Sequence, residues 1–272
     1  MEAETVLEIR NLCCGYGGGD VIRDISLKAG RGEILCIAGP NGCGKTTLLK
    51  AIAHILDYRG SISVDSREVS SFSRKALARK IAVMSQGQEI YFPFTAADTV
   101  ALGRYAHSEK YIPSLSRKDR DLVAEALEKL GLSGVKDSMI NELSGGQLQR
   151  VFLARTLVQD PEIILLDEPT NHLDLKYQVE LLRGLTEWVR ENNRTVIAVL
   201  HDLNLSRSFA DTIALMRDGE LAAMGSPAAA LDRETLKSVY GMDVHSFMLR
   251  SLSAWQAGTA VSGRTGQDCR HA

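Results

Sequence analysis

The chain has 272 residues, of which 44% are hydrophobic and 24% are charged. This balance is typical of one globular domain or of two closely packed subdomains. A formal net charge of −2 leaves no basic footprint for nucleic acid. No apolar stretch approaches the roughly 20 residues of a transmembrane helix, and no signal peptide precedes the first strand signal, so we expect a cytoplasmic chain. The five cysteines form no C-x-x-C pair, which favours a reduced compartment over a disulfide framework or a zinc site.

Strand and helix signals alternate along the chain, which predicts an α/β fold with a mainly parallel core sheet and helices on its faces. Core strands are expected at 32–38, 80–85, 162–167, 195–200 and 212–216. Short strand signals near glycine-rich turns predict a small antiparallel side sheet from 5–10, 61–64 and 220–224. The long insertion between the second and third core strands, about residues 90–158, is expected to be a helical subdomain.

Two helix starts can be placed from their caps. Ser116 and Asp119 form a capping-box pattern, and the apolar helical face that follows them ends at Gly131. Ser226 precedes a proline at the first position of a further helix. From Leu249 onward the composition turns polar without periodicity, so we predict one folded domain over 1–248 and a flexible tail over 249–272.

The most specific motif is a complete G-x-x-x-x-G-K-[ST] phosphate loop between a strand signal and a helix signal. It consists of Gly39, Pro40, Asn41, Gly42, Cys43, Gly44, Lys45, Thr46 and Thr47. The glycines let successive backbone N–H groups turn inward at a helix N-terminus, whose dipole favours phosphate. We expect Lys45 to reach the β- and γ-phosphates and the Thr46 hydroxyl to bind Mg²⁺. The sequence therefore predicts a nucleoside triphosphate site.

Two acids follow the apolar run at 163–166. Parallel α/β sheets bind ligands at the carboxyl ends of their strands, so Asp167 is expected to hold Mg²⁺. Glu168 is expected to orient and polarise the water that attacks the γ-phosphate. Alone, such a pair is more often a helix cap or a surface turn. The phosphate loop upstream favours the catalytic interpretation.

The segment Ser144-Gly145-Gly146-Gln147 opens another helix signal. The serine would cap this helix and the glycines would expose its N-terminus, which makes a second anion site. After Leu143, the segment resembles the signature of the ATP-binding-cassette (ABC) family of P-loop NTPases. The other motifs of that family follow in order over residues 5–245, at Tyr16, Gln86, the D-loop 171–174 with Asp174, and His201.

The resemblance implies a role for each of these residues. Tyr16 would stack on adenine, and Gln86 would belong to the Q-loop and to the Mg²⁺ site. His201 would donate to the γ-phosphate as charge develops there. The catalytic set would be Lys45, Gln86, Glu168 and His201. Judged without the family, Tyr16 is alternatively a turn aromatic, Gln86 a polar group at a strand end, and His201 a loop histidine.

The family also implies partners. One monomer has no room to close both anion sites on a single phosphate tail. The signature residues 144–147 of one copy would therefore face the phosphate loop of a second ATP-binding subunit, as in a homodimer. We expect this pair to bind permease subunits through segment 87–104, at the cytoplasmic face of the membrane. An external substrate-binding protein would be an indirect partner.

Three stretches narrow the resemblance, namely 87–104, 167–178 and 200–205. Together they resemble the ATPases of importers for iron–siderophore complexes, haem and cobalamin. An exporter ATPase would share every catalytic residue, and a soluble ABC ATPase acting on DNA, ribosomes or cluster assembly is a different class; both alternatives stay open. A purely regulatory binding module is disfavoured because Glu168 and His201 are both present.

One departure from the family is Cys43, where many relatives carry serine. A thiol beside Lys45 and at a helix N-terminus is expected to have a lowered pKa. We predict that alkylation of Cys43 blocks ATP binding and that Cys43→Ser escapes the block. The alternative is an inert sulfur that the nucleotide and the neighbouring backbone bury.

Overall fold

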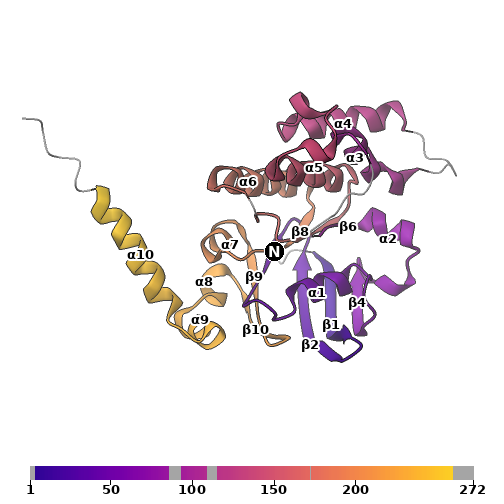
Figure 1. Cartoon of the computed structure of the whole chain (residues 1–272). Coiled ribbons are helices and arrows are strands. Elements are labelled where there is room, and N and C mark those ends of the chain that lie inside the picture. Colours follow the sequence, from indigo (N-terminus) through magenta and orange to yellow (C-terminus); the bar gives the residue numbers. More distant parts are fainter. Residues whose placement is uncertain (1–3, 86–92, 109–114, 172, 260–272) are drawn as a thin grey trace, which may run out of the picture.

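The structure is a computed structural model that describes residues 4–85, 93–108, 115–171 and 173–259, with side chains described as far as Ser253. Figure 1 shows helices α3 (Ala96–Ala101), α4 (Arg117–Lys129) and α5 (Gly145–Val158) at one end of the molecule. Strands β1 (Thr5–Tyr16), β2 (Gly19–Gly30) and β4 (Arg59–Val64) lie at the other end. The core sheet lies between them, and helix α10 extends away from the body.

Six strands form the core sheet, in the order β10-β9-β3-β8-β7-β6. All neighbouring pairs are parallel except β10 with β9. The bounds are β3 (Ile34–Ala38), β6 (Ile81–Met84), β7 (Ile163–Asp167), β8 (Thr195–Val199), β9 (Thr212–Arg217) and β10 (Glu220–Gly225). The mainly parallel sheet and its five core strands are thus confirmed.

Strand β10 corrects one prediction, because segment 220–224 belongs to the core sheet and not to the side sheet. Leu221 pairs with Met216, and Glu220 pairs with Arg217. The two residues between the strands, Asp218 and Gly219, have φ values of 49° and 83°. An Asp-Gly pair with positive φ at both positions forms a tight hairpin. This turn folds β10 back onto β9, so that its strand hydrogen bonds belong to the core sheet.

The side sheet is antiparallel, in the order β2-β1-β4-β5. Its strands are β1 (Thr5–Tyr16), β2 (Gly19–Gly30), β4 (Arg59–Val64) and β5 (Arg67–Glu68). Strand β2 was not expected from the sequence. Its signal is the alternation of the buried residues Ile25, Leu27 and Ala29 with exposed polar residues, which is the period of a strand with one buried face.

Both faces of the core sheet are buried, which explains the continuous apolar runs of its strands. Leu35 and Ile37 of β3 pack toward the side sheet and α1 (Lys45–Ile52). Ile34 and Cys36 pack on the opposite face, with α6 (Leu175–Asn192) and α7 (Leu203–Phe209). Because β3, β7 and β8 are parallel, their carboxyl ends lie at the same edge of the core sheet. The phosphate loop, Glu168 and His201 follow these three strand ends.

Helices α3 (Ala96–Ala101), α4 (Arg117–Lys129) and α5 (Gly145–Val158) pack around a third apolar cluster. The predicted capping box at the start of α4 is confirmed, because Ser116 and Asp119 bond to each other's backbone N–H. The predicted helix after Ser226 is also present. The remaining helices are α2 (Arg74–Lys80), α8 (Pro227–Ala230), α9 (Arg233–Tyr240), and the short 3₁₀ turns Val69–Ser71, Leu102–His107, Ser133–Val135 and Ile140–Glu142.

Helix α10 (Val244–Thr259) extends into the predicted flexible tail, because residues 249–259 are helical. Asp243 starts this helix by accepting a hydrogen bond from the Ser246 N–H at 3.0 Å. Phe247, Leu249 and Leu252 are all more than half exposed, and the apolar contacts of this helix with the core come from Val244 and Met248 near its start. Within the described part of the chain, no helix has the length and apolar character to cross a membrane.

Candidate active site

The phosphate loop connects β3 to α1 at the carboxyl edge of the core sheet. Gly44, at the start of α1, has a φ of 101°, and no side chain caps the helix. The N–H groups of its first turn are therefore available to an anion. A Cβ atom on Gly44 would lie 2.7 Å from Ile22 Cδ1 of β2, so the side sheet lies close against the loop, and the φ of 101° itself favours glycine.

The C-terminal strands hold the loop from behind. The Gly219 N–H, in the turn between β9 and β10, donates to the Cys43 carbonyl at 3.2 Å. The Gly219 carbonyl accepts in turn from the Arg23 N–H of β2 at 2.8 Å. Gly39 has a φ of 146°, and a Cβ atom there would lie 2.3 Å from the carbonyl oxygen of Met216. The conformation of the loop thus depends on residues far along the chain.

Lys45 lies inside the loop, with only 5% of its surface exposed. Its Nζ donates to the carbonyl oxygens of Gly39 and Pro40, at 2.8 and 2.9 Å. An ammonium group has three N–H donors, so one remains for a ligand.

Thr46 and Asp167 meet where α1 and β7 approach each other. The Thr46 hydroxyl donates to Asp167 Oδ1 at 3.2 Å, and Asp167 is 5% exposed. Burial raises the pKa of Asp167, and the charge of Glu168 adds to the rise, whereas the Thr46 hydrogen bond lowers it. A buried carboxylate beside a hydroxyl oxygen is a donor set of the kind that Mg²⁺ takes, and a cation there would relieve the cost of burying the charge.

Glu168 lies directly beyond β7, and both oxygens of its carboxylate have partners. Oε1 bonds to His201 Nε2, and Oε2 accepts from Asn171 Nδ2. The Glu168 side chain is 14% exposed and that of His201 is 36% exposed. Glu168 has a φ of 55°, which is uncommon for a residue with a side chain. Strained backbone of this kind is concentrated at functional sites.

A cavity of about 590 Å³ brings these elements together. It is lined by Val21, Asn41, Gly42, Gly44, Lys45, Thr46, Thr47, Glu168, Asn171 and His201. The structure therefore places the predicted phosphate loop, Glu168 and His201 around one space. The sequence analysis assigned no part in it to Val21 or to the side chain of Asn171. Val21 lies in the strand that was missed, and Asn171 was noted only as part of the D-loop.

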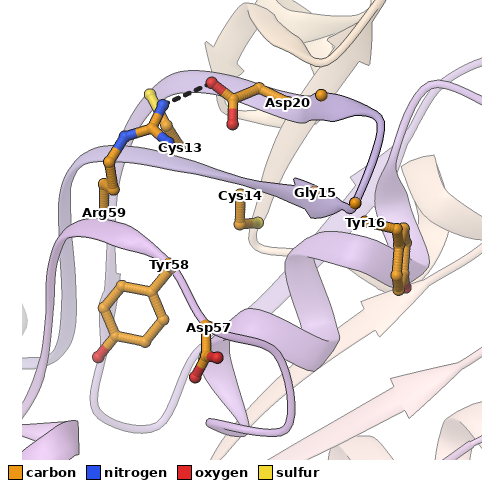
Figure 2. A pocket seen from close by; sticks show the side chains of 10 residues that line it. Cys13, Cys14, Gly15, Tyr16, Asp20, Asp57, Tyr58 and Arg59 are labelled. Carbon is orange, nitrogen blue, oxygen red and sulfur yellow. Dashed lines mark hydrogen bonds and ion pairs between the residues drawn. The ribbon is translucent and has the colours of Figure 1, made fainter.

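Tyr16 lies at the end of β1, and half of its surface is exposed. The Lys50 Nζ of α1 donates to the Tyr16 hydroxyl at 3.3 Å. Tyr16 borders a second cavity, of about 350 Å³. Figure 2 shows Tyr16 at one end of this cavity and the ion pair of Asp20 with Arg59, at 2.6 Å, at the other. The Lys50 Nζ lies over the ring at 5.6 Å from its centroid, and the exposed part of the ring can stack on a planar group.

The signature segment caps α5 in the way the sequence predicts. The Gln147 N–H donates to Ser144 Oγ at 3.3 Å, and Gln147 Oε1 accepts from the Ser144 N–H at 2.9 Å. Gly145 is exposed, and a Cβ atom on Gly146 would lie 3.3 Å from Leu173 Cδ2. Among the residues that the structure describes, those lining the two cavities do not include the signature segment.

Cys43 overturns the prediction of a reactive thiol. Its surface is 5% exposed, and burial raises its pKa despite the opposing charge of Lys45. The desolvation of the thiolate outweighs the attraction of the ammonium and of the loop's N–H groups. The buried sulfur considered as the alternative is therefore the better description, and here protein atoms alone bury it.

Asp174, the predicted D-loop acid, starts α6, and its Oδ1 accepts from the Tyr177 N–H at 3.1 Å. Gln86 and His172 lie outside the described residues, as do residues 87–92 of the segment expected to bind a permease.

Comparisons with known proteins agree with this geometry. Residues 22–171 match the family described as ABC transporter. The chain is 37% identical over 241 residues to the petrobactin import ATP-binding protein FpuD of Bacillus anthracis, covering 88% of each chain. It is 34% identical over 242 residues to the ferric enterobactin transport ATP-binding protein FepC of Escherichia coli, covering 88% of this chain and 89% of the relative.

Solved structures show the same architecture. One, of a metal-chelate type ABC transporter in an inward-facing conformation, matches with a TM-score of 0.77 at 27% identity, over 88% of this chain and 90% of the other. Another, a dimeric ATP-binding cassette bound to ADP and Pi, matches with a TM-score of 0.73 at 29% identity, over 81% and 98%. The chain belongs to the ATP-binding proteins of the ABC transporter family, and it is an ATPase.

Proposed function

We propose that the chain hydrolyses ATP in the 590 Å³ cavity to drive import of an iron chelate through a separate permease. The observation that carries this proposal is the similarity to FpuD and FepC along 88% of this chain and nearly the same share of theirs. Both names specify transport of a siderophore, petrobactin or enterobactin. The cavity contributes the chemistry, because it joins a phosphate loop to a carboxylate and an imidazole.

Binding uses the groups that the fold leaves available. The N–H groups of the loop from Gly39 to Thr47 and the ammonium of Lys45 bind the β- and γ-phosphates. The exposed ring of Tyr16 stacks on adenine. Cys43 contributes its backbone, since its thiol is buried.

Hydrolysis depends on Glu168, which directly follows β7, and on His201. Glu168 accepts a proton from the attacking water, and its contacts with His201 and Asn171 hold the carboxylate in place. His201 lines the same cavity and donates to the γ-phosphate oxygen as negative charge grows there. Gln86, as the Q-loop residue, completes the proposed catalytic set.

Mg²⁺, when bound, would neutralise charge on the phosphate oxygens. Thr46 and Asp167, which already share a hydrogen bond, would hold it, together with Gln86. Loss of the carboxylate at Asp167 is therefore expected to weaken binding of MgATP.

The working form is a dimer. The signature residues Ser144, Gly145, Gly146 and Gln147 begin a capped helix whose N-terminus is open to an anion. Since this segment lies apart from the cavity of its own chain, it meets the ATP of a second copy, and Asp174 of the D-loop lies at the same junction. The dimeric cassette bound to ADP and Pi supports this arrangement.

The permease is bound from the cytoplasmic face of the membrane through segment 87–104, with an external siderophore-binding protein on the far side. A pull-down of the tagged chain from detergent-solubilised native membranes tests this proposal, with mass spectrometry of the partners. A polytopic permease that co-purifies with an external binding protein is the expected result, and the ligand on that protein identifies the cargo. A permease without a binding protein would indicate export, and soluble or ribosomal partners alone would refute transport.

A further inference from the structure

We infer that Asn171 is a positioning residue for the general base. Its side-chain amide donates a hydrogen bond to Oε2 of Glu168 and fixes the direction of the carboxylate toward the attacking water. This inference rests on the proposed role of Glu168 in hydrolysis. Asn171 also lines the 590 Å³ cavity, so the amide acts at the edge of the space where the γ-phosphate is bound.

The backbone around the pair is held independently of this contact. The Asn171 N–H donates to the Glu168 carbonyl at 3.2 Å, which closes a turn. The Gln149 side chain of α5 donates to the Pro169 carbonyl, and the Gln178 side chain of α6 donates to the Thr170 carbonyl at 3.1 Å. Three hydrogen bonds thus hold residues 168–171 without any contribution from the Asn171 amide.

The amide also has a chemical advantage over the other partner of Glu168. Oε1 bonds to His201, whose imidazole is needed at the γ-phosphate. An asparagine amide neither titrates nor carries charge. It therefore holds Oε2 in place while His201 changes its partner. Each carboxylate oxygen has two lone pairs, so Oε2 can still accept a proton from water.

The experiment measures ATP turnover and ATP affinity for Asn171→Ala and for the near-isosteric Asn171→Asp, which removes the donor at constant shape. Asn192→Ala is the matched control, because Asn192 is an exposed asparagine whose amide bonds to the Trp188 carbonyl at 2.9 Å at the far end of α6. We expect kcat to fall by roughly 10- to 100-fold in both Asn171 variants, with ATP affinity and melting temperature close to those of the wild type. Asn192→Ala is expected to retain wild-type kcat.

A double-mutant cycle with Glu168→Gln separates positioning from a structural role. If Asn171 acts through Glu168, adding Asn171→Ala to Glu168→Gln causes no further loss of kcat. Equal fold-losses in both backgrounds, or a loss of ATP affinity in place of kcat, would overturn the inference. Full turnover in Glu168→Gln alone would refute the proposed function first, and the positioning role with it.

Discussion

Replacing Gly39 with alanine tests whether the C-terminal strands fix the shape of the phosphate loop. A Cβ atom at this position would lie 2.3 Å from the Met216 carbonyl oxygen and 2.9 Å from Cys43 Sγ. Cβ contacts shorter than 3.0 Å essentially do not occur, so the loop and β9 must separate by at least 3.0 − 2.3 = 0.7 Å. Because β9 is paired on both sides, with β3 and β10, it cannot move freely.

The loss of folding free energy expected for Gly39→Ala has two parts. A non-glycine residue at a φ of 146° is strained, by about 1–3 kcal/mol. Overpacking against a fixed backbone adds about 1–3 kcal/mol. Together these costs, about 2–6 kcal/mol, lower the melting temperature by about 4–24 °C in a chain of this size. A displacement approaching 1 Å in the loop is expected to lower kcat/KM by about 100-fold.

Two further glycines serve as controls in the same thermal-melt and turnover assays. Gly42 has a φ of 81° but open space around its Cβ position, so Gly42→Ala should show the strain alone, about 1–2 kcal/mol. Gly184, inside α6, has open space and ordinary helical backbone, so Gly184→Ala should stabilise by about 0.5–1 kcal/mol. A Gly39→Ala protein that melts as high as Gly42→Ala would refute the argument that β9 supports the loop.

Three other predictions follow from burial and charge. The Ser116 hydroxyl, and then Arg104, lower the pKa of Asp119 from 3.8 to about 2. This carboxylate therefore stabilises the fold above pH 4, and the stabilisation is lost as the pH falls toward 2. Asp119→Asn should lower the free energy of unfolding by about 1–2 kcal/mol in urea titrations at pH 7 and by less at pH 3, and an equal loss at both pH values would contradict this prediction. Since burial raises the pKa of Cys43, peptide mapping after alkylation should find it labelled far more slowly in the native protein than in urea, and equal rates would refute its burial. Leu252 is 56% exposed, so Leu252→Ser should change stability by less than about 0.5 kcal/mol, whereas a larger loss would show that the Leu252 side chain is buried.

The sequence predicted those elements whose cause is local. A phosphate loop is recognisable because its glycines and lysine fall within nine consecutive positions. The capping box at Ser116 and the serine cap at Ser144 each involve only four consecutive residues. The core strands are apolar on both faces, so they were also visible. These features need no knowledge of what packs against them.

The predictions that failed depend on distant neighbours. Segment 220–224 has a strand composition in either sheet, and only the Asp-Gly turn directs it to β9. The pKa of Cys43 depends on burial beneath a loop whose supports lie elsewhere in the chain, so the neighbouring lysine alone gave the wrong sign. The bond between Asn171 and Glu168 needs the unusual φ of Glu168, which no composition reveals.

The segment from β9 to α9 contains none of the nucleotide-binding motifs, yet it supports the phosphate loop. Gly219 bonds to the Cys43 carbonyl, and Arg217 bonds to the Ser238 carbonyl of α9 at 2.8 Å, which ties that helix to the end of β9. Tyr240, at the end of α9, is close to the phosphate loop, because Cys43 and the backbone of Gly39 both affect its pKa. Burial raises this pKa to about 12, Cys43 adds to the rise, and a hydrogen bond with the Gly39 backbone opposes it. The motifs supply the N–H groups and the carboxylate that meet ATP. Their relative positions are set by β9, β10 and α9, so a chain that kept every motif but lost these elements would keep the chemical groups and lose the site.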